Sequence, residues 1–143
     1  MAATACLRQV SFGLLDMAYY TKKDEFTDDI IPFEKKAWKK AILGEQLPDT
    51  CMTVQFSHIM AGGYAAGYYS YKWAEVLDAD AFAVFKKHGI FNQETAQRFR
   101  DEILSKGGTE HPMTLYKNFK GSEPTIDALL KRNGIAKGKK VKK

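Results

Sequence analysis

One stretch of the sequence, residues 56–73, concentrates the side chains that could do chemistry. It reads FSHIMAGGYAAGYYSYKW and contains one histidine, three glycines and four tyrosines. Tyr64, Tyr68 and Tyr71 are spaced i, i+4 and i+7, so on a helix their side chains would share one face. His58 lies one short loop upstream. These phenols and the imidazole could donate hydrogen bonds to one substrate, and a rigidly held tyrosine is a suitable donor to a developing oxyanion.

The same residues also have a purely structural interpretation. Tyrosines at helical spacing commonly pack in a core or an interface, where each hydroxyl is paired with a neighbour. A lone histidine such as His58 is often a hydrogen-bonded core residue. Gly62 and Gly63 could let the backbone move or approach a ligand closely, but they could equally form an ordinary turn. Spacing alone therefore leaves the substrate-binding and the packing interpretations both open.

The element that must hold the tyrosines is the longest helical pattern in the chain. It is predicted over residues 64–88 and is closed by Gly89, a residue type common just after a helix. Glu75 and Asp78 extend the tyrosine face along the next turns. An apolar segment over residues 55–63 leads into this helix.

The rest of the chain is also predicted to be helical. Apolar residues recur at helical spacing, while proline, asparagine and glycine mark the helix ends. No strand-like alternation of useful length occurs. The fold class is therefore predicted to be all-α, with several helices. The further helices are predicted over residues 3–21, 32–44, 93–104, 112–119 and 124–133.

Composition favours one folded helical region followed by a basic tail. The 143 residues are 45% hydrophobic and 13% aromatic, which is enough to form a core. Of the 22 basic residues, five are lysines between Lys137 and Lys143, and the other 17 balance the 17 acidic residues. A lysine run can bind nucleic acid, but no basic stripe continues into the helices. We therefore interpret residues 1–136 as a single region and 137–143 as a disordered tail, with no nucleic-acid partner expected.

The cysteines and the apolar runs bear on the compartment. Cys6 and Cys51 lie far apart and form no C-x-x-C pair, so a reducing cytoplasm is predicted. The N-terminal segment carries Arg8 and Asp16, which leaves no apolar core for a secretory signal. No apolar run approaches the ~20 residues that a membrane helix needs. We expect a cytoplasmic protein with no membrane partner.

The run from His58 to Glu75 resembles the glycine-rich segment of the thimet oligopeptidase family of zinc metallopeptidases. The interval of six from His58 to Tyr64 is more similar to the bacterial peptidyl-dipeptidase branch. The resemblance covers nearly the whole chain apart from the lysine tail. The other similar segments lie at residues 7–9, 12–16, 76–82, 98–100, 103–108 and 115–116.

The resemblance implies a larger helical fold with a deep channel, in which a short peptide lies over a zinc ion. This chain would be its C-terminal, substrate-binding part. By position, Tyr71 and His58 would be catalytic and would donate hydrogen bonds to the scissile carbonyl or its tetrahedral intermediate. Tyr64 and Tyr68 would contact the substrate backbone. The mobile loop over the bound peptide would contain Gly62 and Gly63.

The zinc motif of that family is missing from this sequence. In the family, an H-E-x-x-H helix and a downstream glutamate hold the zinc, and the motif glutamate activates the water. Here the histidines are His58, His88 and His111, and none is four residues from another. A catalytic zinc site needs about three protein ligands. We therefore expect no metal ligands and no bound zinc on this chain alone, which would be inactive without the upstream region of the peptidase.

Three hypotheses remain, in decreasing order of support. The first is part of a zinc oligopeptidase, similar to the peptidyl-dipeptidases, that hydrolyses short peptides. The second is a non-catalytic helical module that binds peptides. The third is a nucleic-acid-binding domain that uses the lysine tail.

Overall fold

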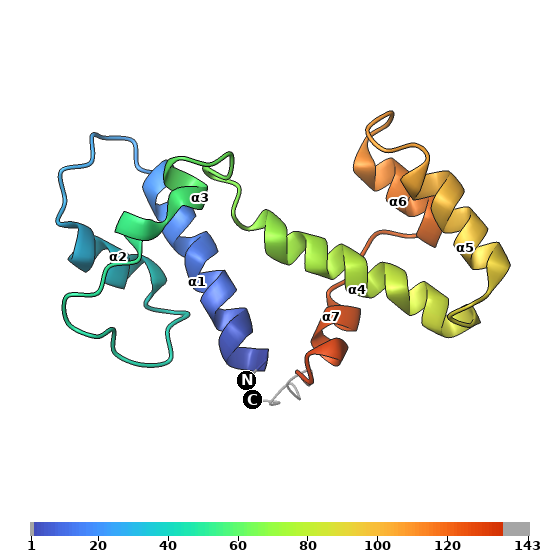
Figure 1. Ribbon diagram of the computed structural model, residues 1–143, viewed down its shortest axis with the longest axis horizontal. Helices are drawn as coiled ribbons and strands as arrows, with labels where there is room; N and C mark the ends of the chain where they lie inside the picture. Colours follow the sequence, from blue (N-terminus) through green and yellow to red (C-terminus); the bar gives the residue numbers. More distant parts are fainter. Residues whose placement is uncertain (1, 136–143) are drawn as a thin grey trace, which may run out of the picture. The chain divides into compact units, whose positions relative to one another are not determined.

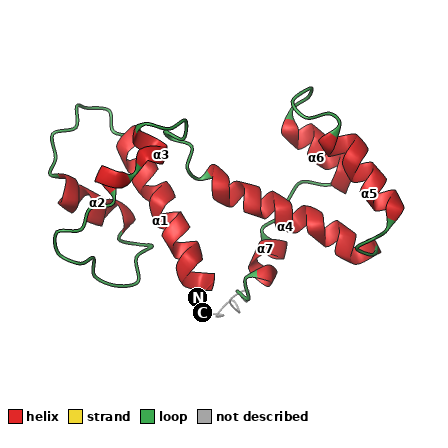
Figure 2. Ribbon diagram, viewed as in Figure 1, coloured by secondary structure: helices red, strands yellow, loops and turns green. Residues whose placement is uncertain are grey.

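The computed structural model describes residues 2–135, and every regular element in that range is a helix (Figure 1; Figure 2). The all-α prediction is confirmed. No helix among these residues is long and apolar enough to cross a membrane. The chain divides into two compact units, unit 1 up to Trp73 and unit 2 from Ala74. The tail at 137–143 lies outside the described residues, and the single region over 1–136 stays a prediction.

Unit 1 is built on α1, Ala2–Tyr20, which agrees with the predicted helix to within one residue at each end. It continues with α2, Ile30–Trp38, the short 3-10 helix η1, Thr53–Gln55, and α3, Ser57–Met60. Aromatic rings from α1, α2 and the later segments meet in one core. Its buried members are Phe12, Leu15, Trp38, Phe56, Ile59 and Tyr68.

The long connection after α2 is held by a buried carboxylate. α2 ends at Trp38 and not near Gly44 as predicted, because the chain turns back at once, with Ala41 N–H donating to the Trp38 carbonyl at 2.8 Å. The returning segment reaches Glu34, whose oxygens accept from the N–H of Met52 (3.0 Å) and of Thr53 (2.7 Å). Burial alone would raise the pKa of Glu34, but these donors hold that pKa below its ordinary value.

Unit 2 begins within α4, Ser70–His88, and continues with further helices up to α7. Two predicted helix ends are confirmed here: the Asn92 side chain accepts from Thr95 N–H at 2.8 Å, and Gly89 has a φ of +106°. The last helix begins at Asp127 and not at residue 124 as predicted. The phenylalanine rings Phe85, Phe99 and Phe119 pack together. The later helices are α5 at Gln93–Phe99, the π-helix η2 at Arg100–Leu104, α6 at Pro112–Lys120 and α7 at Asp127–Arg132.

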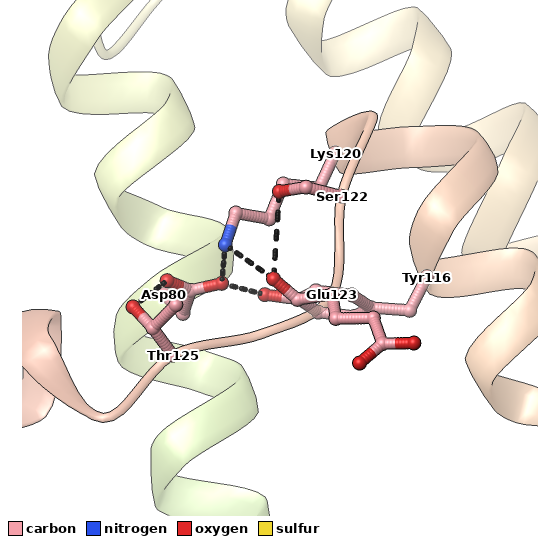
Figure 3. A network of polar contacts seen from close by, with 6 residues as sticks. All are labelled: Asp80, Tyr116, Lys120, Ser122, Glu123 and Thr125. Atoms are coloured by element: carbon pink, nitrogen blue, oxygen red, sulfur yellow. Dashed lines mark hydrogen bonds and ion pairs between the residues drawn. The ribbon is translucent and has the colours of Figure 1, made fainter.

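A polar network ties α4 to α6 and to the segment that follows it (Figure 3). Asp80, 5% exposed, accepts from the Tyr116 hydroxyl at 2.6 Å and pairs with the Lys120 ammonium at 2.5 Å. Thr125 contributes a longer bond of 3.4 Å to the other carboxylate oxygen. Burial raises the pKa of Tyr116, and the neighbouring carboxylate raises it further, so the phenol remains a donor.

Candidate functional site

The segment that carries the tyrosines is not helical where the sequence predicted it to be. α4 begins at Ser70 and not at Tyr64, so only Tyr71 lies on this helix. Residues 61–69 form a series of turns, in which Gly67 N–H donates to the Tyr64 carbonyl at 2.8 Å. Ala66 has a φ of +54°, a left-handed conformation that ends any regular helix. The predicted common helical face of the three tyrosines is therefore wrong.

The tyrosine rings nevertheless lie together. The rings of Tyr64 and Tyr71 are stacked with their centres 5.2 Å apart, and Tyr68 lies 5.1 Å from Tyr71. The imidazole of His58 lies 5.7 Å from the ring of Tyr64 and 6.3 Å from that of Tyr71. We call these four residues the phenol cluster. Its members come from α3, the turns and the start of α4, all in unit 1.

Exposure divides the phenol cluster into two parts. The side chains of Tyr64 and Tyr71 are each 39% exposed, and His58 is exposed as well. Tyr68 is only 7% exposed, and its hydroxyl donates to the Gln9 side chain at 3.2 Å. The packing interpretation therefore holds for Tyr68, whereas Tyr64, Tyr71 and His58 present polar atoms to the outside.

Tyr71 is suited to act as a donor. Its pKa is raised from the ordinary tyrosine value, first by its hydrogen bond with Tyr64, then by desolvation and by the charge that neighbouring phenols would carry if ionised. A phenol with a raised pKa keeps its proton at neutral pH. To donate this O–H to an acceptor that gains negative charge, Tyr71 would have to leave its contact with Tyr64.

The two glycines before Tyr64 have different surroundings. Gly62 N–H donates to the Ser57 carbonyl at 2.7 Å, and a Cβ added to Gly62 would lie 3.0 Å from the backbone oxygen of His58. That contact is tighter than most Cβ contacts in proteins, so a side chain at Gly62 would force the turn behind His58 to shift. A Cβ on Gly63 would meet no atom within 4 Å. Close backbone packing thus explains Gly62, and it does not explain Gly63.

Asp16 is a site residue that the sequence reasoning did not single out. Its side chain is fully buried, and its two oxygens accept from the N–H of Ala66 and of Tyr68, each at 2.9 Å. A signal existed, because Asp16 shares the apolar face of α1 with Phe12 at i, i+4 spacing. A carboxylate on such a face needs donors from another segment.

The described residues do not supply a metal site. Over residues 3–135, where side chains are described, no group of three or more His, Cys, Asp or Glu side chains is placed to hold a metal ion. The donor set that a catalytic zinc requires is therefore not assembled by this part of the chain.

The chain was compared with known proteins. The family model of Peptidase family M3 matches residues 1–135. Oligopeptidase A of Escherichia coli is 48% identical over 135 residues, which cover 94% of this chain and 20% of the relative. Oligopeptidase A of Haemophilus influenzae is 47% identical with the same coverage. Dipeptidyl carboxypeptidase of Salmonella typhimurium is 36% identical over 125 residues, 86% of this chain and 18% of the relative. The chain thus spans about a fifth of the length of the curated relatives it matches.

Proposed function

The chain belongs to peptidase family M3, and from this premise we propose that it is the C-terminal, substrate-binding part of a zinc-dependent oligopeptidase that hydrolyses short peptides. The observation that carries the proposal is the phenol cluster. Two exposed tyrosines and an exposed histidine converge at one place in unit 1, although the backbone between them is irregular. The match to oligopeptidase A and dipeptidyl carboxypeptidase adds peptide hydrolysis as the reaction class.

We assign separate roles within the cluster. Tyr71 donates its O–H to the scissile carbonyl oxygen as that oxygen becomes negatively charged, and His58 is the second donor. Tyr64 contacts the substrate backbone, and its ring stacks on that of Tyr71. Tyr68 contributes its ring, because Gln9 already accepts from its hydroxyl.

The glycine pair has a proposed role of its own. Gly62 and Gly63 belong to the loop that we propose covers the bound peptide. Gly62 fixes the turn behind His58, and Gly63 leaves room beside it. A close approach of the peptide backbone at Gly63 would use that room.

The metal and the remaining catalytic groups must come from elsewhere in the full-length protein. Zinc is proposed as its cofactor, supplying Lewis-acid chemistry when bound, and the rest of the peptidase is proposed to supply its ligands. On its own the chain is proposed to be inactive. We propose a cytoplasmic location for the full-length protein, which the two widely separated cysteines support.

One alternative has an observation in its favour. A non-catalytic helical module could bind peptides through the exposed residues of the phenol cluster. Metal analysis and peptide hydrolysis by the full-length protein separate the two. Zinc binding with turnover supports the oligopeptidase, and peptide binding without either supports the module.

The sharpest test of the proposal is Tyr71→Phe in the full-length enzyme. The substitution removes one hydroxyl and keeps the ring that stacks on Tyr64. Loss of an oxyanion donor typically lowers kcat by roughly 10²–10³-fold, and KM should change little because the bond forms mainly in the transition state. Steady-state kinetics with a short peptide measure both constants.

Tyr69→Phe is the matched control. Tyr69 is 59% exposed and is a neighbour in sequence, but it is not a member of the phenol cluster. We expect Tyr69→Phe to keep most of the activity. Equal and small effects at Tyr69 and Tyr71 would contradict the donor role of Tyr71.

A further inference from the structure

The turn that carries Tyr64 and Tyr68 contains a strained backbone conformation, and no contact within the turn accounts for it. Ala66 has a φ of +54°, although glycines are available close by at Gly63 and Gly67. A left-handed conformation is costly for alanine, and it persists only where surrounding contacts enforce it. The question is therefore which group holds Ala66 in place.

Asp16 is that group. Its buried carboxylate spans the turn, with one oxygen on the N–H of Ala66 and the other on the N–H of Tyr68, both at 2.9 Å. A buried carboxylate without donors is strongly unfavourable, so the carboxylate and the turn each require the other. A hydrogen bond links this turn to the start of α4, because the Ser70 N–H donates to the Gly67 carbonyl at 3.0 Å.

The same face of α1 fixes the segment at further points. Gln9, Phe12 and Asp16 lie at helical spacing, one or two turns apart. Gln9 accepts from the Tyr68 hydroxyl, and the Phe12 ring lies 5.7 Å from the ring of Tyr68. Because Tyr68 in turn packs 5.1 Å from Tyr71, α1 sets the position of the exposed donor through one buried ring.

We propose that Asp16 is a positioning residue: by holding the N–H groups of Ala66 and Tyr68, it fixes the turn that brings Tyr64 and Tyr71 together. Its effect on peptide hydrolysis rests on the proposed function, whereas its effect on the ring positions does not. We assign Asp16 no contact with a reacting group, because it acts only through the backbone of the turn.

The experiment uses the full-length enzyme with Asp16→Asn. Asparagine has almost the same shape, but its amide NH₂ would face a backbone N–H in place of an acceptor. ¹³Cζ-labelled tyrosine NMR follows the titration of Tyr71, which is identified by its loss in Tyr71→Phe. We expect the titration of Tyr71 to change, because the turn that stacks the ring of Tyr64 on that of Tyr71 loses the bonds that fix it. We also expect kcat to fall at least tenfold.

Asp80→Asn is the matched control. It removes a buried carboxylate in the same way, but Asp80 belongs to unit 2 and bonds to Tyr116 and Lys120, whereas the phenol cluster belongs to unit 1. It should leave both kcat and the titration of Tyr71 unchanged at a temperature where the enzyme is folded. An equal shift of the Tyr71 titration in both variants would mean a general loss of structure and would overturn the proposal.

A rescue separates positioning from direct participation. Adding Ala66→Gly to Asp16→Asn should restore part of kcat and of the Tyr71 titration, because glycine adopts the left-handed conformation freely. Failure of this rescue in a folded double variant would overturn the positioning role. So would a folded Asp16→Asn enzyme with unchanged kcat and unchanged Tyr71 titration.

Two further outcomes are informative. If Asp16→Asn does not fold, hydrogen exchange in the unsubstituted enzyme decides: slow exchange at the Ala66 and Tyr68 amides supports the proposal, and exchange as fast as in a free loop overturns it. If Asp16→Asn shifts the Tyr71 titration but neither Asp16→Asn nor Tyr71→Phe lowers kcat, the positioning role stands. In that case the donor role proposed for Tyr71 is wrong.

Discussion

The two units both bury carboxylates, but they use them on different partners. In unit 1, Asp16 accepts hydrogen bonds from two backbone N–H groups of a turn. Glu34 accepts from two backbone N–H groups of the segment at Met52 and Thr53. In unit 2, Asp80 accepts a hydrogen bond from the Tyr116 hydroxyl and pairs with the Lys120 ammonium, and both residues lie on α6. Backbone N–H groups are thus among the donors to both carboxylates of unit 1, with side chains of Gln46 and Thr53 added at Glu34. The printed bonds to Asp80 in unit 2 come from side chains, two on α6 and that of Thr125 after it.

This difference follows the distribution of exposed polar groups. Unit 1 contains the phenol cluster, two of whose tyrosines lie in turns, and irregular backbone leaves N–H groups that need acceptors. In unit 2, the rings of Phe85, Phe99 and Phe119 pack on one another, and α5 begins at a side-chain cap from Asn92. Changes to unit 1 carboxylates should therefore alter local geometry, and changes to Asp80 should alter mainly stability.

The largest expected effect on stability is that of Asp80→Ala. The substitution leaves the Lys120 ammonium, whose side chain is 16% exposed, and the Tyr116 hydroxyl without their acceptor. Removing one partner of a buried ion pair typically costs roughly 3–5 kcal/mol. Urea unfolding of the 143-residue chain, followed by circular dichroism, should show the loss.

Asp78→Ala is the control for this prediction. Asp78 pairs with Arg132 at the surface, where side chains are 65% and 39% exposed, and such pairs are worth at most about 1 kcal/mol. A similar loss of stability in both variants would show that the Asp80 network is no stronger than a surface ion pair.

Glu34→Gln should have an intermediate effect that is confined to unit 1. Glutamine keeps one acceptor oxygen but turns its NH₂ toward the N–H of Met52 or Thr53, which leaves a buried donor unpaired. This should cost roughly 1–3 kcal/mol. Both tryptophans lie in unit 1, so their fluorescence reports this transition, with the exposed Glu25→Gln as a control that should change nothing.

The pH dependence gives a second check on Glu34. Because its pKa is lowered on folding, its contribution to stability is complete above the ordinary value of 4.5 and is lost as the pH falls through the folded-state pKa. The stability difference between the unsubstituted chain and Glu34→Gln should therefore shrink on acidification below 4.5. A constant difference across that range would argue against an ionised, hydrogen-bonded Glu34.

The smallest effect separates the two glycines of the site. Gly62→Ala places a methyl group 3.0 Å from the His58 carbonyl oxygen and should cost roughly 1 kcal/mol, because the turn must shift. Gly63→Ala meets nothing within 4 Å and should stay within about 0.5 kcal/mol. Fluorescence-detected urea midpoints measure both. Equal urea midpoints for the two variants would indicate that the turn behind His58 accommodates the added methyl group with no loss of stability.

Local signals in the sequence predicted most helix ends of unit 2. Asn92 caps α5, Gly89 follows α4, and Pro112 opens α6, as the residue types indicate. In unit 1 the same signals predicted that α2 extends to Gly44, although it ends at Trp38. They also predicted that the tyrosine helix begins at Tyr64 instead of Ser70. The second error lies where a buried carboxylate from another segment, that of Asp16 on α1, holds the backbone of Ala66 and Tyr68. The first lies where the chain turns back directly after Trp38.

The sequence by itself determined the all-α class, the family resemblance and the membership of the candidate site, because residue types, periodicity and motif are local properties. Only the tertiary structure decided how Tyr64 and Tyr71 meet. The bonds responsible join Asp16 to Ala66 and Tyr68, 50 and 52 residues away along the chain, and no local propensity encodes such a contact. The phenols converge because a carboxylate on α1 stabilises a conformation that alanine and its neighbours would not adopt alone.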